Sequence, residues 1–253
     1  MIEGKTIAKK IKEEAIEILR NKNAFVAIVS VGNNESATSY THALTQNFES
    51  ASVDYAVYTL EEHITQKDFD YLIETLENTD YITAIFLHRP LPKHLKEPSL
   101  RKDLDNPPCT ATAVIEILKA QNIEMQSKNC LIIGRSEIVG KPLSRLLLDE
   151  NATVTIAHSY TKNLQNFTKK ADIIIVAVGK ANFITGEAIS ENAVVIDVGI
   201  NYVDGKLTGD CDFQSVITKT PYVTPVPGGV GPVTSAVVLA NLVEMTSPKK
   251  TIQ

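Results

Sequence analysis

The stretch with the clearest chemical potential is an apolar run that leads into a glycine turn. Residues 131–142 read Leu-Ile-Ile-Gly-Arg-Ser-Glu-Ile-Val-Gly-Lys-Pro. The apolar run is too short for a helix and predicts a buried strand, Gly134 permits a tight turn, and Pro142 suits the first turn of a helix. The N-terminus of such a helix attracts anions, and in an open α/β sheet the usual anion is a dinucleotide pyrophosphate.

The glycine spacing alone is a weak signal. The common dinucleotide fingerprint is G-x-G-x-x-G, whereas here Ser136 occupies the middle position and Gly140 comes one residue late. A tight strand-to-helix turn without a ligand explains this segment about equally well. The neighbouring residues are therefore needed to choose between a binding site and a purely structural turn.

The residues after the next strand indicate which dinucleotide would bind. In NAD-binding folds a carboxylate roughly 20 residues past the glycine turn accepts the ribose hydroxyls. Here the expected strand 152–157 ends in His158 and Ser159, and Arg135 lies inside the glycine turn. An arginine with nearby hydroxyls suits a ribose phosphate, so the sequence predicts NADP rather than NAD. Taken singly, Arg135 is explained as a surface arginine and His158 as a strand-end histidine bonded to backbone.

Strands and helices alternate along most of the chain, which predicts an α/β fold with parallel sheets and helices on their faces. The expected helices cover 5–20, 36–51 with Ser36 as the cap, 66–76, 110–120, 142–149, 162–170 and 234–245. The expected strands cover 24–31, 53–60, 81–87, 130–133, 152–157, 172–178 and 193–199. Proline-rich residues 89–108 interrupt the alternation and predict a connection between domains, and 222–231 form a second proline and glycine break.

Composition narrows the class of protein. A chain of 253 residues with 43% hydrophobic and 22% charged residues is typical of a globular protein with two domains. It contains no apolar run of membrane-spanning length, and its first residues lack the apolar core of a signal peptide, so we expect a cytoplasmic protein without a membrane partner. A net charge of -5 without basic clusters, apart from Lys249–Lys250, argues against nucleic acid. The widely spaced Cys109, Cys130 and Cys211 are expected to be reduced, buried thiols.

Together these segments resemble the bifunctional methylenetetrahydrofolate dehydrogenase/methenyltetrahydrofolate cyclohydrolase (FolD) family. The longest matching motif, Thr-Pro-Val-Pro-Gly-Gly-Val-Gly-Pro at 224–232, is unusual enough that chance explains it poorly. The resemblance covers the second half of the chain in register. Its motifs lie at 134–142, 152–155, 158–161, 195–200, 209–213 and 224–232.

The resemblance implies a folate-binding catalytic domain (1–109 plus 233–253) and a Rossmann-type NADP-binding domain (110–232). It also implies a last helix that returns to the first domain, tetrahydrofolate derivatives as substrates, and a homodimer formed through the cofactor domain. Arg135, Ser136 and Ser159 would then hold the ribose phosphate, and the loop Gly228–Gly231 would flank the nicotinamide and pterin. The candidate cofactor-binding residues are Gly134, Arg135, Ser136, Val139, Gly140, His158, Ser159, Ile200 and Gly231. The candidate substrate-binding residues are Tyr40, Asp105, Pro227, Gly228 and Gly229, and the candidate catalytic residues are Tyr40, His88 and Asp105.

The first half departs from the family on the folate side. The motif Ser-x-x-Tyr-x-x-x-Lys maps onto Ser36 or Ala37 through Tyr40, and its lysine falls on Leu44. The motif Val-Gln-Leu-Pro-Leu-Pro appears at 87–92, with His88 for the glutamine and an arginine for the first leucine. Lys-Asp-Val-Asp-Gly appears at 102–106 with Asp105 retained, where a carboxylate suits the amino-pyrimidine edge of a pterin. A connecting segment that the family usually carries after this motif is missing.

These departures affect the two family activities unequally. Hydride transfer depends mainly on the positioning of two rings, whereas loss of a general acid/base typically costs roughly 10²- to 10⁴-fold in hydrolysis. We therefore expect an NADP-dependent dehydrogenase with weakened or absent cyclohydrolase activity. His88, with a reference pKa of roughly 6.5, would be either a substitute proton carrier or simply a polar strand-end residue. Two alternatives stay open, a non-catalytic dinucleotide-binding paralogue and an oxidoreductase for a different cyclic substrate.

Overall fold

The computed structural model describes residues 1–32 and 35–247, and their side chains except those of 35 and 36. By compactness the chain divides into two units. One unit combines Met1–Lys9 with Pro108–Thr234, and the other combines Lys10–Pro107 with the chain from Ser235 onward. Helices α1 (Gly4–Leu19) and α8 (Val230–Thr246) each contribute to both units.

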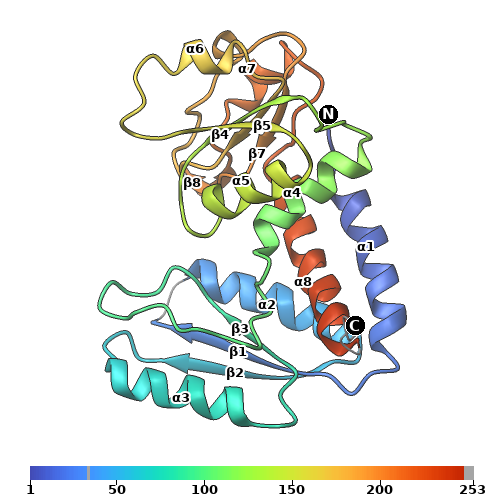
Figure 1. The fold of residues 1–253 in the computed structure, drawn as a ribbon, viewed down its shortest axis with the longest axis vertical. Coiled ribbons are helices and arrows are strands. Elements are labelled where there is room, and N and C mark those ends of the chain that lie inside the picture. The colour runs from blue at the N-terminus through green and yellow to red at the C-terminus, as the bar shows by residue number, and fades with distance from the viewer. Residues whose placement is uncertain (33–34, 248–253) are drawn as a thin grey trace. The chain divides into compact units, whose positions relative to one another are not determined.

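The unit that contains Lys10–Pro107 is built on a parallel sheet in the order β2-β1-β3. Figure 1 shows helices α2 and α3 on opposite faces of this sheet. Phe69 and Ile73 of α3 pack with Ala27 and Leu87 in one apolar core, and Thr65 caps α3 by accepting from Asp68 N at 3.2 Å. Its elements are β1 Phe25–Val31, α2 Glu35–Ser50, β2 Asp54–Leu60, α3 Gln66–Asn78 and β3 Ala84–Leu87.

The C-terminal half of α8 completes this unit. Asn241 Nδ2 donates to the carbonyl oxygens of Leu104 at 3.1 Å and Pro107 at 3.2 Å, and Asn47 Nδ2 donates to Ser235 O at 3.2 Å. These bonds are consistent with the expected helix that returns to the first domain.

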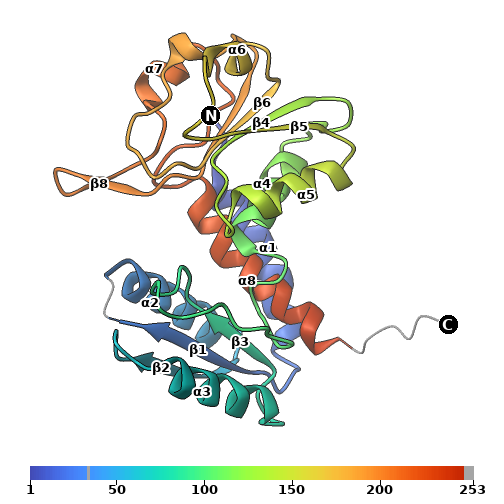
Figure 2. The same cartoon turned by 60° about the vertical axis from the view of Figure 1, so that its left-hand side comes forward.

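The other unit is built on a parallel sheet in the order β5-β4-β6-β7. The chain runs outward from β4 in one direction to β5 and in the other to β6, so the strand order reverses between β4 and β6. Figure 2 shows α4 and α5 on one side of this sheet and α6 and α7 on the other. Its elements are α4 Cys109–Ala120, β4 Asn129–Ile133, α5 Gly140–Asp149, β5 Thr153–Ala157, α6 Gln165–Thr168, β6 Ile173–Val176, β7 Val194–Asp197, β8 Asn201–Val203, β9 Lys206–Thr208 and α7 Phe213–Ile217.

The predicted α/β fold with parallel sheets is confirmed, but some element bounds were wrong. The helix expected over 162–170 is only the four-residue α6, because Asn163 adopts a left-handed conformation with φ of 53° just before it. The last helix begins at Val230 rather than 234, since a proline at 232 is tolerated in a first turn. Helix α2 begins at Glu35, so Ser36 lies inside the helix, and its side chain is outside the described residues.

The hairpin of β8 and β9 and the helix α7 were not predicted. An antiparallel hairpin joins β8 and β9 through Asp204 and Gly205, both with positive φ, and an Asp-Gly pair is a strong hairpin signal. Helix α7 begins after Asp212, whose side chain caps it by accepting from Ser215 N at 3.1 Å. The cysteines are free and buried as predicted. Within the described residues no helix is long and apolar enough to cross a membrane.

Candidate functional site

The glycine turn lies where the strand order reverses. Gly134 follows β4 with φ of 127°, and a Cβ there would overlap the carbonyl oxygen of Ala177, which follows β6. A Cβ on Gly140, the first residue of α5, would overlap the carbonyl oxygen of Gly134. Both glycines are therefore required by the close approach of backbone segments. The reversal point at the carboxyl ends of parallel strands is the usual ligand position in such sheets.

The residues between these glycines prepare the start of α5. Ser136 Oγ accepts from Val139 N at 3.1 Å, and Ser136 O accepts from Lys141 N at 3.0 Å. Val139 occupies the cap position of α5. The predicted residues Ser136 and Val139 therefore shape the turn that presents the helix N-terminus, which is the part of a helix that favours a phosphate.

A cation and hydroxyl groups gather beyond the end of β5. The guanidinium carbon of Arg135 lies 5.6 Å from the ring centre of Tyr160, and both side chains are exposed, as is that of Ser159. His158 Nδ1 accepts from Tyr160 N at 3.2 Å, which is the backbone-bonded role expected of a strand-end histidine. Tyr160 was missed as a site residue, although an aromatic ring two positions after His158 was a visible signal. The arrangement offers a positive charge and hydroxyls, as a ribose phosphate requires.

Two buried aspartates that the sequence analysis did not select organise the neighbouring loops. Asp210 Oδ2 accepts from the backbone amides of Val178 at 2.6 Å and Gly179 at 2.9 Å. Its Oδ1 accepts from Lys180 N at 2.8 Å and from Asn201 Nδ2 at 2.9 Å. This carboxylate therefore fixes the loop after β6 to the hairpin that follows β7.

Asp197, the last residue of β7, accepts hydrogen bonds from backbone amides on both sides of the β8–β9 hairpin. Its Oδ1 accepts from the amides of Gly199 and Asp210, both at 2.9 Å, and its Oδ2 accepts from Cys211 N at 2.8 Å. Burial raises the pKa of Asp197, although these amides act in the opposite direction. A Cβ on Gly199 would overlap the Asp210 carboxylate, which explains a glycine just before the exposed, predicted cofactor residue Ile200.

The first residues of the chain support the proline and glycine loop near the end. Gly4 N donates to Gly228 O at 2.9 Å, and a Cβ on Gly4 would overlap the carbonyl oxygen of Gly229. Gly228 has a φ of 106°, and the neighbouring Pro227 is exposed. Gly231 is exposed in the first turn of α8, so the structure corrects its expected place in a loop.

On the folate side, the predicted Tyr40 and His88 are neighbours. His88 follows β3, where the order of the other sheet also reverses, and Tyr40 lies on α2. The ring centres of Tyr40 and His88 are 5.9 Å apart in an edge-on arrangement, and each ring also contacts Phe86. Thr41 Oγ1 lies 2.8 Å from His88 Nε2, in hydrogen-bond contact.

The environment of His88 weakens it as a base. Burial lowers the pKa of His88 from 6.5 to about 4. The imidazole is therefore neutral near pH 7 and binds a proton weakly there. Leu44, one helical turn after Tyr40 on α2, is fully buried in the apolar interior. An aromatic, hydrogen-bonding surface is thus present, but no titratable lysine stands at position 44.

The predicted Asp105 lies beside an arginine. Residues 102–104 run next to β3, with Ile85 N donating to Lys102 O at 2.7 Å and Leu104 N donating to Ile85 O at 2.9 Å. This pairing brings Asp105 toward the end of β3, where Arg89 Nη1 is 3.7 Å from Asp105 Oδ2. Arg89 was noted only as a departure from the family motif and was not predicted as a site residue.

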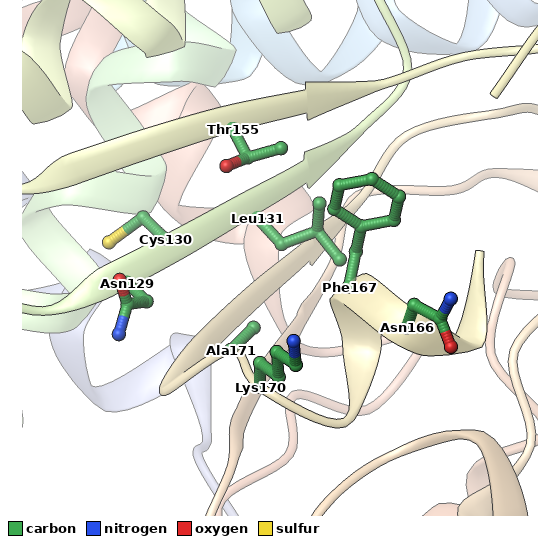
Figure 3. A pocket seen from close by; sticks show the side chains of 8 residues that line it. All are labelled: Asn129, Cys130, Leu131, Thr155, Asn166, Phe167, Lys170 and Ala171. Atoms are coloured by element: carbon green, nitrogen blue, oxygen red, sulfur yellow. The ribbon is translucent and has the colours of Figure 1, made fainter. Parts of the chain in front are cut away.

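A pocket of about 250 Å³ lies elsewhere in the unit that contains β4. Figure 3 shows its lining, which combines residues of β4 and β5 with residues in and just after α6. None of the predicted site residues lines it. The lining residues are Asn129, Cys130, Leu131, Thr155, Asn166, Phe167, Lys170 and Ala171. Burial raises the pKa of Cys130 to about 12, so this thiol is unreactive near neutral pH.

Fold and site define a two-domain α/β protein with a Rossmann-like dinucleotide-binding domain. Residues 2–106 match the family domain described as the tetrahydrofolate dehydrogenase/cyclohydrolase catalytic domain, and residues 108–250 match the NAD(P)-binding domain of the same family. The chain belongs to the tetrahydrofolate dehydrogenase/cyclohydrolase family, as the sequence resemblance predicted.

Individual relatives agree over almost the full length of the chain. A protein named bifunctional protein FolD from Agathobacter rectalis is 40% identical over an alignment that covers 96% of this chain and 98% of that protein. The crystal structure of the bifunctional FolD enzyme from Campylobacter jejuni has a TM-score of 0.91 at 36% identity and covers 97% of both chains. The FolD structure from Trypanosoma brucei, complexed with NADP cofactor and an inhibitor, has a TM-score of 0.90 at 28% identity and covers 97% of this chain and 96% of that one.

Proposed function

We propose that this protein is an NADP-dependent methylenetetrahydrofolate dehydrogenase of one-carbon metabolism, which oxidises methylene- to methenyltetrahydrofolate. The observation that carries the proposal is the glycine turn at Gly134, where no side chain fits. Beside it Arg135 supplies a cation, whereas an NAD-binding fold would supply a carboxylate for the ribose. Membership of the family, with relatives named as bifunctional FolD enzymes, supplies the substrate class.

The residues fit the dinucleotide as a group. The side-chain-free turn between Gly134 and Gly140 leaves backbone amides for a pyrophosphate, and Arg135 with Ser159 suits a ribose phosphate. When bound, the nicotinamide supplies the hydride acceptor. Gly228 and Gly229 would allow flat rings to approach the backbone, and the buried Asp197 and Asp210 keep the adjoining loops in one arrangement.

On the folate side we assign substrate contact to Tyr40 and Asp105. Tyr40 offers a ring face for the pterin, and the Asp105 carboxylate suits its amino-pyrimidine edge. His88, neutral near pH 7, contributes a hydrogen bond at the same strand end rather than a charge.

We propose that cyclohydrolase activity is weak or absent. Hydrolysis of the methenyl cation needs a group that activates water and moves protons, and a missing general acid/base costs roughly 10²- to 10⁴-fold. Leu44 is apolar and buried, and a His88 pKa of about 4 makes the imidazole a poor proton acceptor near pH 7.

One assay tests both activities. Purified protein is mixed with methylenetetrahydrofolate and NADP, NADPH formation is followed, and then the decay of the methenyl product above its spontaneous rate. We expect NADPH formation and little enzymatic decay. Uptake of NADP without turnover of this substrate would replace the proposal with a binding protein, and turnover of other cyclic substrates alone would replace it with a different oxidoreductase.

We also propose the organisation in which this enzyme works. Residues 1–109 with 233–253 would form the folate domain, and 110–232 the NADP domain. The protein would be a cytoplasmic homodimer formed through the NADP domain, without nucleic acid or membrane partners. Sedimentation equilibrium at several protein concentrations tests the dimer, because a monomeric mass at all of them contradicts it.

A further inference from the structure

Arg89 lies at the centre of a group of carboxylates in the connection that follows β3. Its Nη2 donates to Asp103 Oδ2 at 2.8 Å, and its Nε donates to Glu97 Oε1 at 2.6 Å. Its Nη1 donates to Leu87 O at 3.2 Å and lies 3.7 Å from Asp105 Oδ2. One guanidinium thus ties the end of β3 to three acidic side chains.

Asp103 passes this restraint on to the main chain of Asp105. Its Oδ1 accepts from Asp105 N at 3.0 Å while its Oδ2 accepts from Arg89. Asp103 itself is held beside β3 by the backbone pairing of 102–104 with Ile85. The backbone and the carboxylate of Asp105 are therefore both positioned from the same arginine.

Burial distinguishes these contacts from ordinary surface ion pairs. The side chains of Arg89, Asp103 and Asp105 are only 14%, 15% and 13% exposed, whereas that of Glu97 is 53% exposed. Burial alone would lower the pKa of Arg89, but the charges of Asp103 and Glu97 outweigh it and raise the pKa. Arg89 is thus a permanent cation among partly desolvated acids, where the geometry of a forked donor is strongly restrained.

We propose that Arg89 is a positioning residue for folate binding, which holds Asp105 where its carboxylate accepts hydrogen bonds from the amino-pyrimidine edge of the pterin. The inference rests on the proposed function and adds to it a residue that stands in place of a leucine in the family motif. Arg89 acts through Asp103 and Asp105 and is not itself a catalytic residue.

The same connection offers a matched control. Arg101 also donates to a buried carboxylate, with its Nε 2.9 Å from Glu77 Oε2, but its side chain is 73% exposed and its partner lies on α3. Loss of Arg101 therefore removes an arginine tether of the same segment without touching the Asp103–Asp105 pair.

The experiment compares Arg89→Met, Arg89→Lys, Asp103→Asn and Arg101→Met by steady-state kinetics and thermal melting. We expect Arg89→Met and Asp103→Asn to raise the KM for methylenetetrahydrofolate by about tenfold or more, with the KM for NADP changed by less than about twofold. Arg89→Lys should recover part of the loss, because an ammonium keeps the charge but not the fork. Arg101→Met should leave the folate KM within about twofold of wild type.

An unchanged folate KM in Arg89→Met, or equal increases in both KM values together with a lower melting temperature, would overturn the positioning role. If Arg89→Met does not fold, Arg89→Lys and Asp103→Asn decide by the same criteria. If the wild type lacks turnover, calorimetry with tetrahydrofolate replaces the kinetics. If the tetrahydrofolate affinity of Arg89→Met is then at least about tenfold lower than that of the wild type, the positioning role is retained although the proposed function fails. If the wild type does not bind tetrahydrofolate, both the positioning role and the proposed function are contradicted.

Discussion

His88 Nε2 and Thr41 Oγ1 are 2.8 Å apart, so the residue that follows β3 is held to the helix that follows β1. The bond spans the position where the order of the β2-β1-β3 sheet reverses. It gives the partly buried imidazole a neutral hydrogen-bond partner, and burial lowers the pKa of His88 to about 4.

The pKa of His88 predicts a specific pH dependence of stability. With an unfolded pKa of 6.5, the unfolded chain takes up a proton on this residue before the folded protein does. The free energy of unfolding should therefore fall as the pH drops from about 6.5 to about 4, by at most about 3 kcal/mol from this group. Urea titrations at pH 7, 5.5 and 4.5 measure it, and His88→Gln should lack this component. An exposed-residue control, His63→Gln, should keep the wild-type dependence.

Replacement of Arg135 should alter the choice of cofactor. The exposed guanidinium lies near Tyr160, where the proposed binding mode would place the ribose phosphate that NADP carries and NAD lacks. Arg135→Ala should raise the KM for NADP by about 10- to 100-fold and leave the KM for NAD within about twofold, because only the charge-assisted hydrogen bonds to phosphate are lost. Equal changes for both cofactors would contradict the assignment of Arg135 to the ribose phosphate.

Two glycine substitutions separate a structural from a ligand-related requirement. Gly134→Ala should destabilise the protein and abolish NADP uptake, because the new Cβ overlaps Ala177 O and the φ of 127° is strained. In Gly231→Ala the new Cβ has open space around it, so the free energy of unfolding should be unchanged or should rise by up to about 1 kcal/mol. Weaker NADP binding by a stably folded Gly231→Ala would report that the cofactor approaches this backbone, whereas normal binding would remove Gly231 from the site.

Asp210 should be needed for stability as well as for cofactor binding. Asp210→Asn keeps the shape but replaces one accepting oxygen with an N–H₂ group that faces backbone donors. The expected loss is about 2–3 kcal/mol in the free energy of unfolding, with weaker NADP binding. Asp212→Asn is the matched control, because asparagine also caps a helix and should cost less than about 0.5 kcal/mol. Denaturant titration and calorimetry of both variants measure these effects.

The fold class could be predicted from the sequence because the signals that mark its strands and turns lie between residues close together in the chain. Apolar runs separated by turns predicted the parallel strands, and the glycine turn at Gly134 indicated the helix that follows, although α5 begins at Gly140 and not at the predicted 142. Bounds failed where a single backbone conformation decided them, as at Asn163 before α6. The hairpin between β8 and β9 is short and exposed, so it lacks the apolar alternation by which a strand is recognised, although its Asp-Gly turn was visible.

The site was less predictable because its supports come from distant parts of the chain. Asp197 and Asp210 act through backbone amides, and no side-chain pattern indicates which amides a carboxylate will meet. Arg89 depends on a segment 14 residues later in the sequence folding back beside β3. The lowered pKa of His88 is caused by burial, and the sequence analysis had only the reference pKa of the free side chain.

The division of the chain has a consequence for biosynthesis. Residues 1–9 belong with 108–234, and 10–107 belong with the chain from 235 onward. The amide of Ile2 can donate to Val223 O only after Val223 has been synthesised. In the same way, Leu104 O can accept from Asn241 Nδ2 only after Asn241 has been synthesised. Neither half can finish folding while the ribosome is still translating the middle of the message, so the nascent chain must remain partly open until its last helix emerges.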